Sequence, residues 1–453
     1  MRLLLTQLAL APLMWAQLSP VPSQPAQPGF ARTRLSLSLK KAVEIALEPE
    51  GSARIALAEQ AIKQAEARVS LARAAFMPNL DGSVQDRSQT TNLRAFGFNF
   101  QSPFAAAIPG IVGPFSVFDA RASVQQTVLD FTVFRKYKVS QSGLGTAKAD
   151  LDATRNQVRE RVAVDYLACL RADAGLETAQ ANVDLSRALQ ALAESQKAAG
   201  TGTGIETTRA QVQLANDRQR LLVAENNFRR TVLQLLRTMG LNLDAQVDFT
   251  DKLAYQAADV ADVRGLIESA RKTRAEMKAQ QLREETARLN VTAVKAERLP
   301  TIGSFADYGS IGSAIVGAQP THTIGISLKV PVFDGGRRNA RRGESYSQYE
   351  QEKIRSHDLG QQVELEVRLA LDGLSSARSQ VETAREGLTL AESELAQAQR
   401  RYQAGVANSL EVTDAQTRLD RARDNQIAAL YNYNLARIEL ATATGTIAEY
   451  VNQ

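Results

Sequence analysis

Residues 403–416 read QAGVANSLEVTDAQ, and residues 198–211, which lie 205 positions earlier, read AAGTGTGIETTRAQ. In each stretch a glycine separates two proline-free segments, and an acidic residue and a Thr-X-Ala-Gln motif open the second segment. Glycine is favoured just after a helix and acidic residues in a first turn, so both stretches predict a turn between helices. Gly240 and Gly445 match at the same offset. The chain therefore consists of two copies of one structural unit.

Each copy is predicted to contain a very long helix. Proline, which breaks helix interiors, is absent from residues 115–299 and after Pro331. The proline-free segment 337–404 would form about 100 Å of helix at a rise of 1.5 Å per residue. Two shorter helices, expected at 206–239 and 263–299, would flank one long helix if laid end to end. The predicted fold is an elongated, mainly α structure with a small β part and a two-fold internal repeat; an ordinary helical bundle is the alternative.

The β part is predicted from alternating side chains. Strands are expected near 79–91, 117–131, 301–309 and 322–333. In the last of these, one face carries only aliphatic residues, whereas the other is mostly small or polar; the aliphatic face consists of Ile324, Ile326, Leu328, Val330 and Val332. Alternation over about ten residues is typical of a strand with lipid on one side and water on the other. A soluble β-sandwich is the alternative.

Four strands are too few for a membrane barrel. About eight strands are needed merely to fill a barrel's centre with side chains, and hydrocarbon does not tolerate open sheet edges. Three copies would supply 12 strands, an even number with room for water. We therefore expect a trimeric 12-stranded transmembrane β-barrel.

The chain is expected to be exported. Residues 1–16 have a basic Arg2 followed by a short apolar stretch, which is typical of a signal peptide. Residues 17–34 are Pro-rich and predicted to be disordered, and no cysteine near the cleavage point would carry a lipid. The first repeat is assigned to 35–240, an equatorial linker to 241–262 and the second repeat to 263–453.

The sequence lacks the residue patterns of an enzyme or a metal site. Cys169 is the only cysteine, which excludes internal disulfides and C-x-x-C motifs. His322 and His357 share no metal-ligand spacing, and no phosphate-binding loop occurs. The 54 basic and 49 acidic residues are spread along the chain, which is typical of solvated helices. We expect no enzyme activity, no cofactor and no nucleic-acid partner.

Basic residues follow two of the predicted strands. Arg135 and Lys136 follow the strand near 117–131, and Arg337 and Arg338 follow the strand near 322–333. Their place between strand and helix suggests contact with anionic lipid headgroups or with the lumen.

Several motifs together resemble the TolC-type outer membrane efflux proteins. They are Tyr402-Gln403-Ala404-Gly405, Leu410-Glu411-Val412-Thr413-Asp414-Ala415-Gln416, Ala441-Thr442-Ala443-Thr444-Gly445 and Val330-Pro331-Val332-Phe333-Asp334-Gly335-Gly336-Arg337. The resemblance covers residues 37–445. It implies a homotrimer with a barrel in the outer membrane of a Gram-negative-type bacterium and a helical barrel in the periplasm. It also implies two partners, a periplasmic adaptor and an inner-membrane transporter.

The resemblance further places the helix turns near 200–205 and 404–409 at a periplasmic tip. The residues implied in these turns and in adaptor docking are Gly200, Gly202, Gly204, Tyr402 and Gly405. The acidic residues implied to narrow the pore are Glu206, Glu411 and Asp414. Two positions depart from the family pattern: Arg209 stands opposite Asp414 in the repeat, and Ala407 replaces an arginine that latches the tip. Acids at a helix start are also favoured by the helix dipole alone, which is the alternative role.

These inferences predict an outer membrane exit duct for an efflux or type I secretion system. The alternative is an exported coiled-coil protein that tethers or supports the cell envelope. Such a rod would explain the long helices but not strands with one wholly aliphatic face. The sequence does not identify the cargo.

Overall fold

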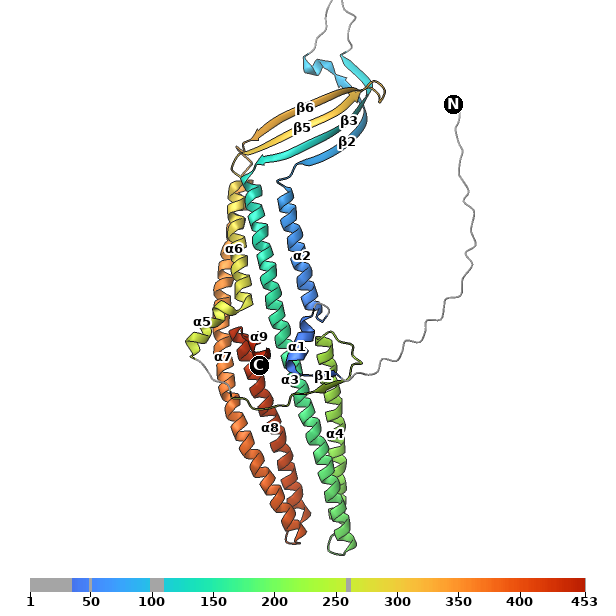
Figure 1. The fold of residues 1–453 in the computed structure, drawn as a ribbon, viewed down its shortest axis with the longest axis vertical. Coiled ribbons are helices and arrows are strands. Elements are labelled where there is room, and N and C mark those ends of the chain that lie inside the picture. The colour runs from blue at the N-terminus through green and yellow to red at the C-terminus, as the bar shows by residue number, and fades with distance from the viewer. Residues whose placement is uncertain (1–34, 49–50, 98–109, 258–261, 453) are drawn as a thin grey trace, which may run out of the picture.

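The computed structural model describes residues 35–48, 51–97, 110–257 and 262–452. The predicted signal peptide and the Pro-rich segment lie outside these residues. The chain is elongated, with a β-sheet at one end, a helical body, and two helical hairpins whose turns form the other end (Figure 1). Among the described residues, no helix combines the length and the apolar character needed to cross a membrane.

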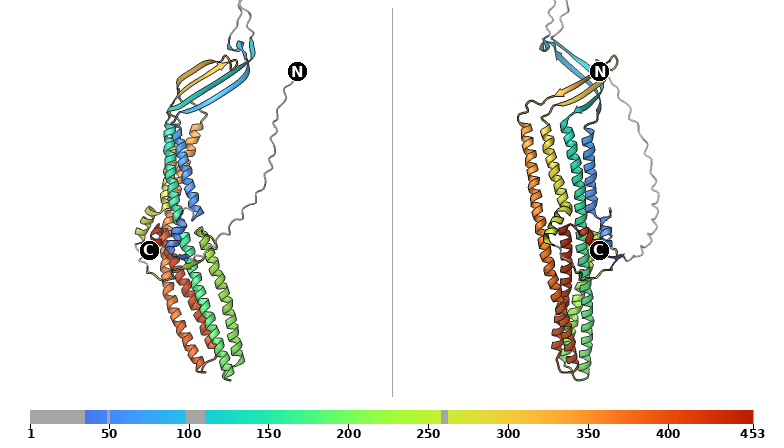
Figure 2. Two further views of the ribbon diagram at one scale, coloured as in Figure 1. Left: turned by 45° about the vertical axis from the view of Figure 1, so that its right-hand side comes forward. Right: turned by 60° about the vertical axis from the view of Figure 1, so that its left-hand side comes forward.

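Two long helices run through the body. They are α3 (Phe131–Ala198) and α7 (Arg337–Gln403), with 68 and 67 residues. Shorter helices pack along them: α2 (Ala53–Ala74), α4 (Gly204–Thr238) and α6 (Ala275–Ala296) along α3, and α6 and α8 (Ser409–Thr444) along α7. In the right-hand view of Figure 2 these helices stand side by side. The two long helices agree with the expectation of one very long helix in each copy.

One predicted helix is broken in the structure. The segment 263–299 forms α5 (Val263–Thr273) and α6, which are separated at Arg274 by an extended backbone with φ −65° and ψ 126°. The buried guanidinium of Arg274 forms ion pairs with Glu276 and with Glu366 on α7. Because this break is stabilised by a charge on another helix and contains no proline or glycine, the local sequence gave no signal for it.

A small equatorial layer surrounds α3 at half its length. Strand β1 (Leu35–Leu37) pairs in parallel with β4 (Val247–Phe249), and α1 (Leu39–Leu47) and α9 (Ile447–Asn452) pack beside them. Tyr166 on α3 donates its hydroxyl hydrogen bond to the Leu37 carbonyl at 3.0 Å and to the Asp251 carboxylate at 2.8 Å. Sequence analysis did not predict β1, β4 or α9.

The sheet at the far end contains β2 (Asn79–Asn92), β3 (Ile111–Leu129), β5 (Thr301–Gly312) and β6 (Gln319–Lys329). All neighbours are antiparallel in the order β2-β3-β5-β6, so β2 and β6 are the edges. The prediction that β6 continues to residue 333 is wrong. Val330 and Val332 lie beyond its last residue and are 54% and 91% exposed. The strand ends before Pro331 because this proline has no N–H to donate to a strand ladder.

The core lies in the helical body. On α8, two groups of buried residues follow the three- and four-residue spacing of a coiled-coil seam, Val412, Ala415 and Leu419 near the tip and Ala429, Tyr433 and Ala436 further along. In the described sheet, by contrast, Gly309 is the only buried residue.

Candidate functional site

The turns at the ends of the two hairpins have the same backbone geometry. Gly200 and Gly405 adopt φ +77° and +71°, a conformation that glycine takes without strain. The N–H of the next residue closes each turn on the helix before it, with Thr201 donating to the Gln196 carbonyl and Val406 to the Arg401 carbonyl, both at 3.0 Å. Both glycines predicted at the tip therefore end the two long helices in the same way.

The first hairpin turn contains an internally capped acid. Glu206 accepts a hydrogen bond from the Thr203 N–H at 2.8 Å, which closes a capping box at the start of α4. Gly204 is the first residue of that helix, and a Cβ on Gly202 would lie 3.0 Å from the Cβ of Gln196. Gly202 therefore lets the turn pack closely on the end of α3.

The second turn distributes its charges differently. Glu411 forms an ion pair with Arg401 across the turn, at 2.9 Å between Nε and Oε1, and its N–H donates to Asn408. Asp414 is exposed and makes no ion pair with any described residue. Of the three acids predicted at the pore, only Asp414 therefore has a carboxylate without a capping or ion-pair role inside the chain.

The two hairpins meet at Tyr402. Its side chain is buried, and its hydroxyl has no hydrogen-bond partner among the described residues. Burial raises the pKa of this phenol, and the nearby Glu206 charge raises it further. Glu206, Arg209, Tyr402 and Ser409 line one small cavity, so the structure brings together residues from both predicted turns.

A buried polar cluster joins the hairpins above the tip. Ser186 donates to the Asp217 carboxylate, and Gln416 on α8 donates to the Ser186 hydroxyl at 2.8 Å. Arg220 reaches both acids, Asp217 at 3.5 Å and Asp420 on α8 at 3.2 Å. Burial and then the Asp217 charge raise the pKa of Asp420 to about 6. Sequence analysis did not identify this cluster, although Asp217 occupies an otherwise mostly apolar seam.

The sheet at the opposite end has two chemically different faces. The strand register gives one face a mainly aliphatic or small character on all four strands, with Leu80, Val84, Ala120, Ala122, Val124, Ile302, Ala306, Ile324, Ile326 and Leu328. The same face also carries Asp86, Gln126, Tyr308 and His322. Ile324, Ile326 and Leu328 are 65–80% exposed. The other face is mainly polar, with Asp81, Ser83, Gln85, Asp119, Arg121, Ser123, Gln125, Asp307, Thr323 and Ser327. An exposed apolar face of this size needs a covering environment.

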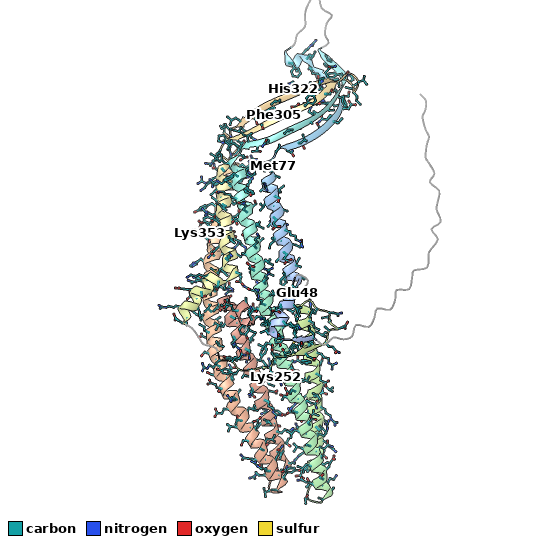
Figure 3. All side chains as sticks on the ribbon, in the orientation of Figure 1. Glu48, Met77, Lys252, Phe305, His322 and Lys353 are labelled. Carbon is teal, nitrogen blue, oxygen red and sulfur yellow. The ribbon has the colours of Figure 1, made fainter. Side chains whose placement is uncertain are left out.

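Figure 3 locates individual side chains on the sheet. His322 and Phe305 lie on it, and Met77 lies where α2 meets it. His322 pairs with Tyr308 on the aliphatic face, whereas Phe305 packs on Gly325 of the polar face. A Cβ on Gly325 would lie 2.5 Å from the Phe305 ring.

Exposed phenylalanines and basic residues lie at the junction between sheet and helices, and they are called the collar below. Phe131, Phe134 and Phe333 are exposed there, and Lys138 lies 4.9 Å from the centre of the Phe134 ring. Of the four predicted interface residues, Arg135, Lys136 and Arg337 are exposed. Arg338 instead donates to the Asp334 carboxylate at 2.8 Å and to the Pro331 carbonyl at 3.1 Å, which ties it to the start of α7.

The remaining candidates for chemistry are inert or isolated. Cys169 is buried, and burial raises the pKa of its thiol to about 12. Within the described ranges, no group of three or more His, Cys, Asp or Glu side chains is arranged to hold a metal ion.

Comparison with known proteins gives matches along most of the chain. The model of the family described as outer membrane efflux protein matches residues 47–241 and 266–446. The pyoverdine export outer membrane protein OpmQ of Pseudomonas putida is 26% identical over 433 residues, which is 92% of this chain and 85% of that protein. The outer membrane protein TolC of Escherichia coli is 23% identical over 263 residues, which is 54% of this chain and 52% of that protein.

Solved structures have the same fold. The outer membrane protein VceC of Vibrio cholerae superimposes with a TM-score of 0.73 at 19% identity, over 90% of this chain and 96% of that chain. The described fold, with a sheet at one end and paired helical hairpins at the other, therefore extends over nearly the whole length of that protein.

Proposed function

Because this chain belongs to the outer membrane efflux protein family, it is an outer membrane channel of the efflux and secretion type with a periplasmic extension, and we propose that three copies assemble to form it. The observation that supports this proposal most directly is the open sheet. It has one aliphatic face, one polar face and two unpaired edges, β2 and β6.

Pairing β6 of one copy with β2 of the next would remove every edge. Three copies would then give 12 strands, with the aliphatic faces toward lipid and the polar faces around a water-filled lumen. The collar of exposed phenylalanines and basic residues would lie at the periplasmic surface of the membrane, where Arg135, Lys136 and Arg337 would contact lipid headgroups. The α-hairpins would extend the duct through the periplasm.

We propose that the hairpin turns form the inner end of the duct and dock a periplasmic adaptor, which joins the channel to an inner-membrane transporter. The two turns, which share their backbone geometry at the glycine, present exposed residues on either side of Gly200 and Gly405. We infer that the choice among cargoes lies with the transporter.

The assembly is tested on the purified protein and in cells. We expect a trimer that dissociates only on heating, that remains in the outer membrane fraction after a carbonate wash, and that conducts in planar bilayers. A peripheral coiled-coil tether would be removed by carbonate and would not conduct. A monomer that stays soluble without detergent would exclude the channel altogether.

Docking at the turns is tested by crosslinking. Thr201→Cys and Val406→Cys place thiols in the two turns, and the native Cys169 is buried, so the parent protein serves as the unreactive control. We expect both variants to capture an adaptor in cells that carry the whole system. Capture from neither position would contradict docking at the tip.

The pore acids are tested by conductance. In the Glu411→Gln/Asp414→Asn variant, we expect a larger single-channel conductance and weaker block by multivalent cations, because carboxylates from three chains would no longer hold cations at the constriction. Unchanged conductance and unchanged block would contradict this assignment.

A further inference from the structure

Charged side chains on the polar face of the sheet are concentrated in three consecutive rows. In the first row Asp81, Ser123, Asp307 and Thr323 lie in register across all four strands. In the second row Arg121 is in register with Ser83 and Gly309, and in the third Asp119 is in register with Gln85. These rows lie near the middle of β3 and β5, away from both sheet ends.

Arg121 is fixed between two of these acids. Its Nε and Nη2 atoms donate to the two Asp119 oxygens at 2.8 and 2.7 Å, and its Nη1 donates to Asp307 on the neighbouring strand at 3.1 Å. Gly309 lies directly beside it, and a Cβ there would come within 2.5 Å of the Arg121 Cβ. Glycine at this position therefore leaves room for the guanidinium to lie across the sheet. Asp119, Arg121 and Asp307 are called the Arg121 network below.

The charges of this region do not cancel. Arg121 is matched by Asp119 and Asp307, and Asp81 adds a third carboxylate whose only side-chain partner among the described residues is the Asn79 amide, at 2.8 Å. At the other end of the polar face the nearest cation is Lys329, the last residue of β6. It lies six residues from Thr323, about 20 Å along the strand at 3.3 Å per residue. Arg87 lies on β2, one row beyond Asp119. It is also six residues from Asp81, about 20 Å along that strand. The three rows around Arg121 therefore carry two more carboxylates than cations in each chain, an excess that Arg87 and Lys329 balance only over the whole length of the polar face.

We propose that the Arg121 network and Asp81 form a second charge-selective lining of the channel, separate from the tip, which favours cationic over anionic solutes in the β-section of the lumen. This inference rests on the proposed trimer, in which three copies bring these residues around one water-filled space. Fixed charges on a pore wall raise the local concentration of counter-ions and so set the preference between ions of opposite sign.

The test changes the same lining in opposite directions. Arg121→Gln removes the cation, and Asp81→Asn/Asp307→Asn removes two carboxylates with almost no change of shape. Reversal potentials are measured in planar bilayers across a KCl gradient near 100 mM, where the screening length is about 10 Å and the charges of Arg87 and Lys329 are largely screened from Asp81. We expect the cation-to-anion permeability ratio to rise about twofold in Arg121→Gln and to fall about twofold in the double variant.

Matched variants separate charge from shape and the sheet from the tip. Gln125→Asn changes a neutral residue on the same face of β3, and Arg121→Lys keeps the charge; we expect the parent permeability ratio in both. Asp81 forms no ion pair with any residue that the structure describes, so Asp81→Asn alone remains informative if Arg121→Gln fails to assemble. The same shifts are expected in a Glu411→Gln/Asp414→Asn background, because the two linings are far apart.

The outcomes distinguish this inference from the proposed function. If the parent protein forms no channels, the proposed function fails and this inference fails with it. If channels form but the permeability ratio is the same in all variants, only the selective lining is excluded. A shift of the permeability ratio in the same direction for Arg121→Gln and the carboxylate variant would also overturn it. Such a result would indicate a general disturbance of the barrel that does not depend on which charge is removed.

Discussion

The helical body and the sheet of this chain differ in where their apolar side chains lie. In the helices, Val162, Leu235 and Val363 are completely buried against other helices of the same chain. In the sheet, Ile324 and Ile326 are 80% and 78% exposed although their hydrogen-bond ladder to β5 is complete. The body therefore gains hydrophobic free energy within one chain, whereas the sheet can gain it only from surroundings that a single chain lacks.

This difference explains why the two parts of the protein tolerate change differently. A substitution in the helical core alters the packing of one chain. A substitution on the aliphatic face of the sheet alters an interaction with lipid, and in a trimer it does so three times. The following variants test that distinction in order of decreasing effect.

The largest effect is expected for Ile326→Lys. A lysine on a lipid-facing strand near the bilayer centre costs about 2–4 kcal/mol, and three copies multiply that cost. We expect the variant to lose the heat-dissociable trimer from the outer membrane fraction, as measured by semi-native electrophoresis.

Its matched control is the next residue on the same strand. Ser327→Lys introduces the same side chain on the polar face, where water would solvate the ammonium group, and we expect normal trimers. Equal loss of both variants, or normal assembly of both, would mean that the two faces of the sheet do not have different surroundings.

A smaller effect is expected in the helical core. Leu235 is fully buried against the equatorial layer, so Leu235→Ala should lower the free energy of unfolding by about 2–5 kcal/mol. Leu233 lies two residues earlier on α4 and is 45% exposed, so Leu233→Ala should change it by at most about 0.5 kcal/mol. Denaturant unfolding of the detergent-solubilised protein, followed by circular dichroism, measures both. A large loss for Leu233→Ala would indicate that this residue is covered in the assembled protein.

The parts of the fold that the sequence predicted are those controlled by local chemistry. The presence of very long helices follows from the absence of proline, and the strands follow from alternating side chains because a strand presents successive residues to opposite faces. The turn glycines were also predictable, since their left-handed backbone excludes most other residues.

The missed features depend on contacts between distant segments. The break at Arg274 is stabilised by Glu366, 92 residues away. Strand β1 is held by Tyr166, which donates to the Leu37 carbonyl, and Asp251, just after β4, accepts from the Leu39 N–H. At the tip, the sequence identified Glu411 but not its pairing with Arg401, which requires the turn to bring α7 and α8 together. Local patterns carry no information on such pairs.

The buried cluster between the hairpins predicts a pH-dependent stability. The pKa of Asp420 is raised from an ordinary value of 3.8 to about 6, because burial and Asp217 disfavour its charged form. The folded chain therefore holds this proton more tightly than the unfolded chain. Stability is greatest below about pH 4 at this site and falls by up to about 3 kcal/mol as the pH rises through 6.

Asp420→Asn tests this dependence, because the amide keeps the shape without the charge. We expect the variant to lose the slope between pH 4 and 6 and to be more stable than the parent at pH 8, measured by thermal unfolding at a series of pH values. Glu386→Gln, an exposed acid on α7 that does not contribute to the pKa of Asp420, serves as the control and should retain the parent's slope. An unchanged slope in Asp420→Asn would show that the Arg220 ion pair compensates for burial.

The smallest change in stability is expected at the tip, where the two copies of the repeat differ most. Arg401→Gln removes an exposed ion pair and should cost only about 0.2–1 kcal/mol, within the range for surface pairs. Arg400→Gln removes an equal charge from the neighbouring residue, which has no ion pair with a described residue, and should cost no more.

Conductance should nevertheless separate the two variants. Loss of Arg401 leaves three unpaired Glu411 carboxylates at the proposed constriction, whereas Glu206 in the first turn remains held by its own helix start. We expect stronger cation block in Arg401→Gln than in Arg400→Gln, and loss of this difference when Glu411→Gln is added to both variants. Identical block in both arginine variants would mean that Glu411 does not face the pore, and Asp414 would then be the only acid of the three available to narrow it.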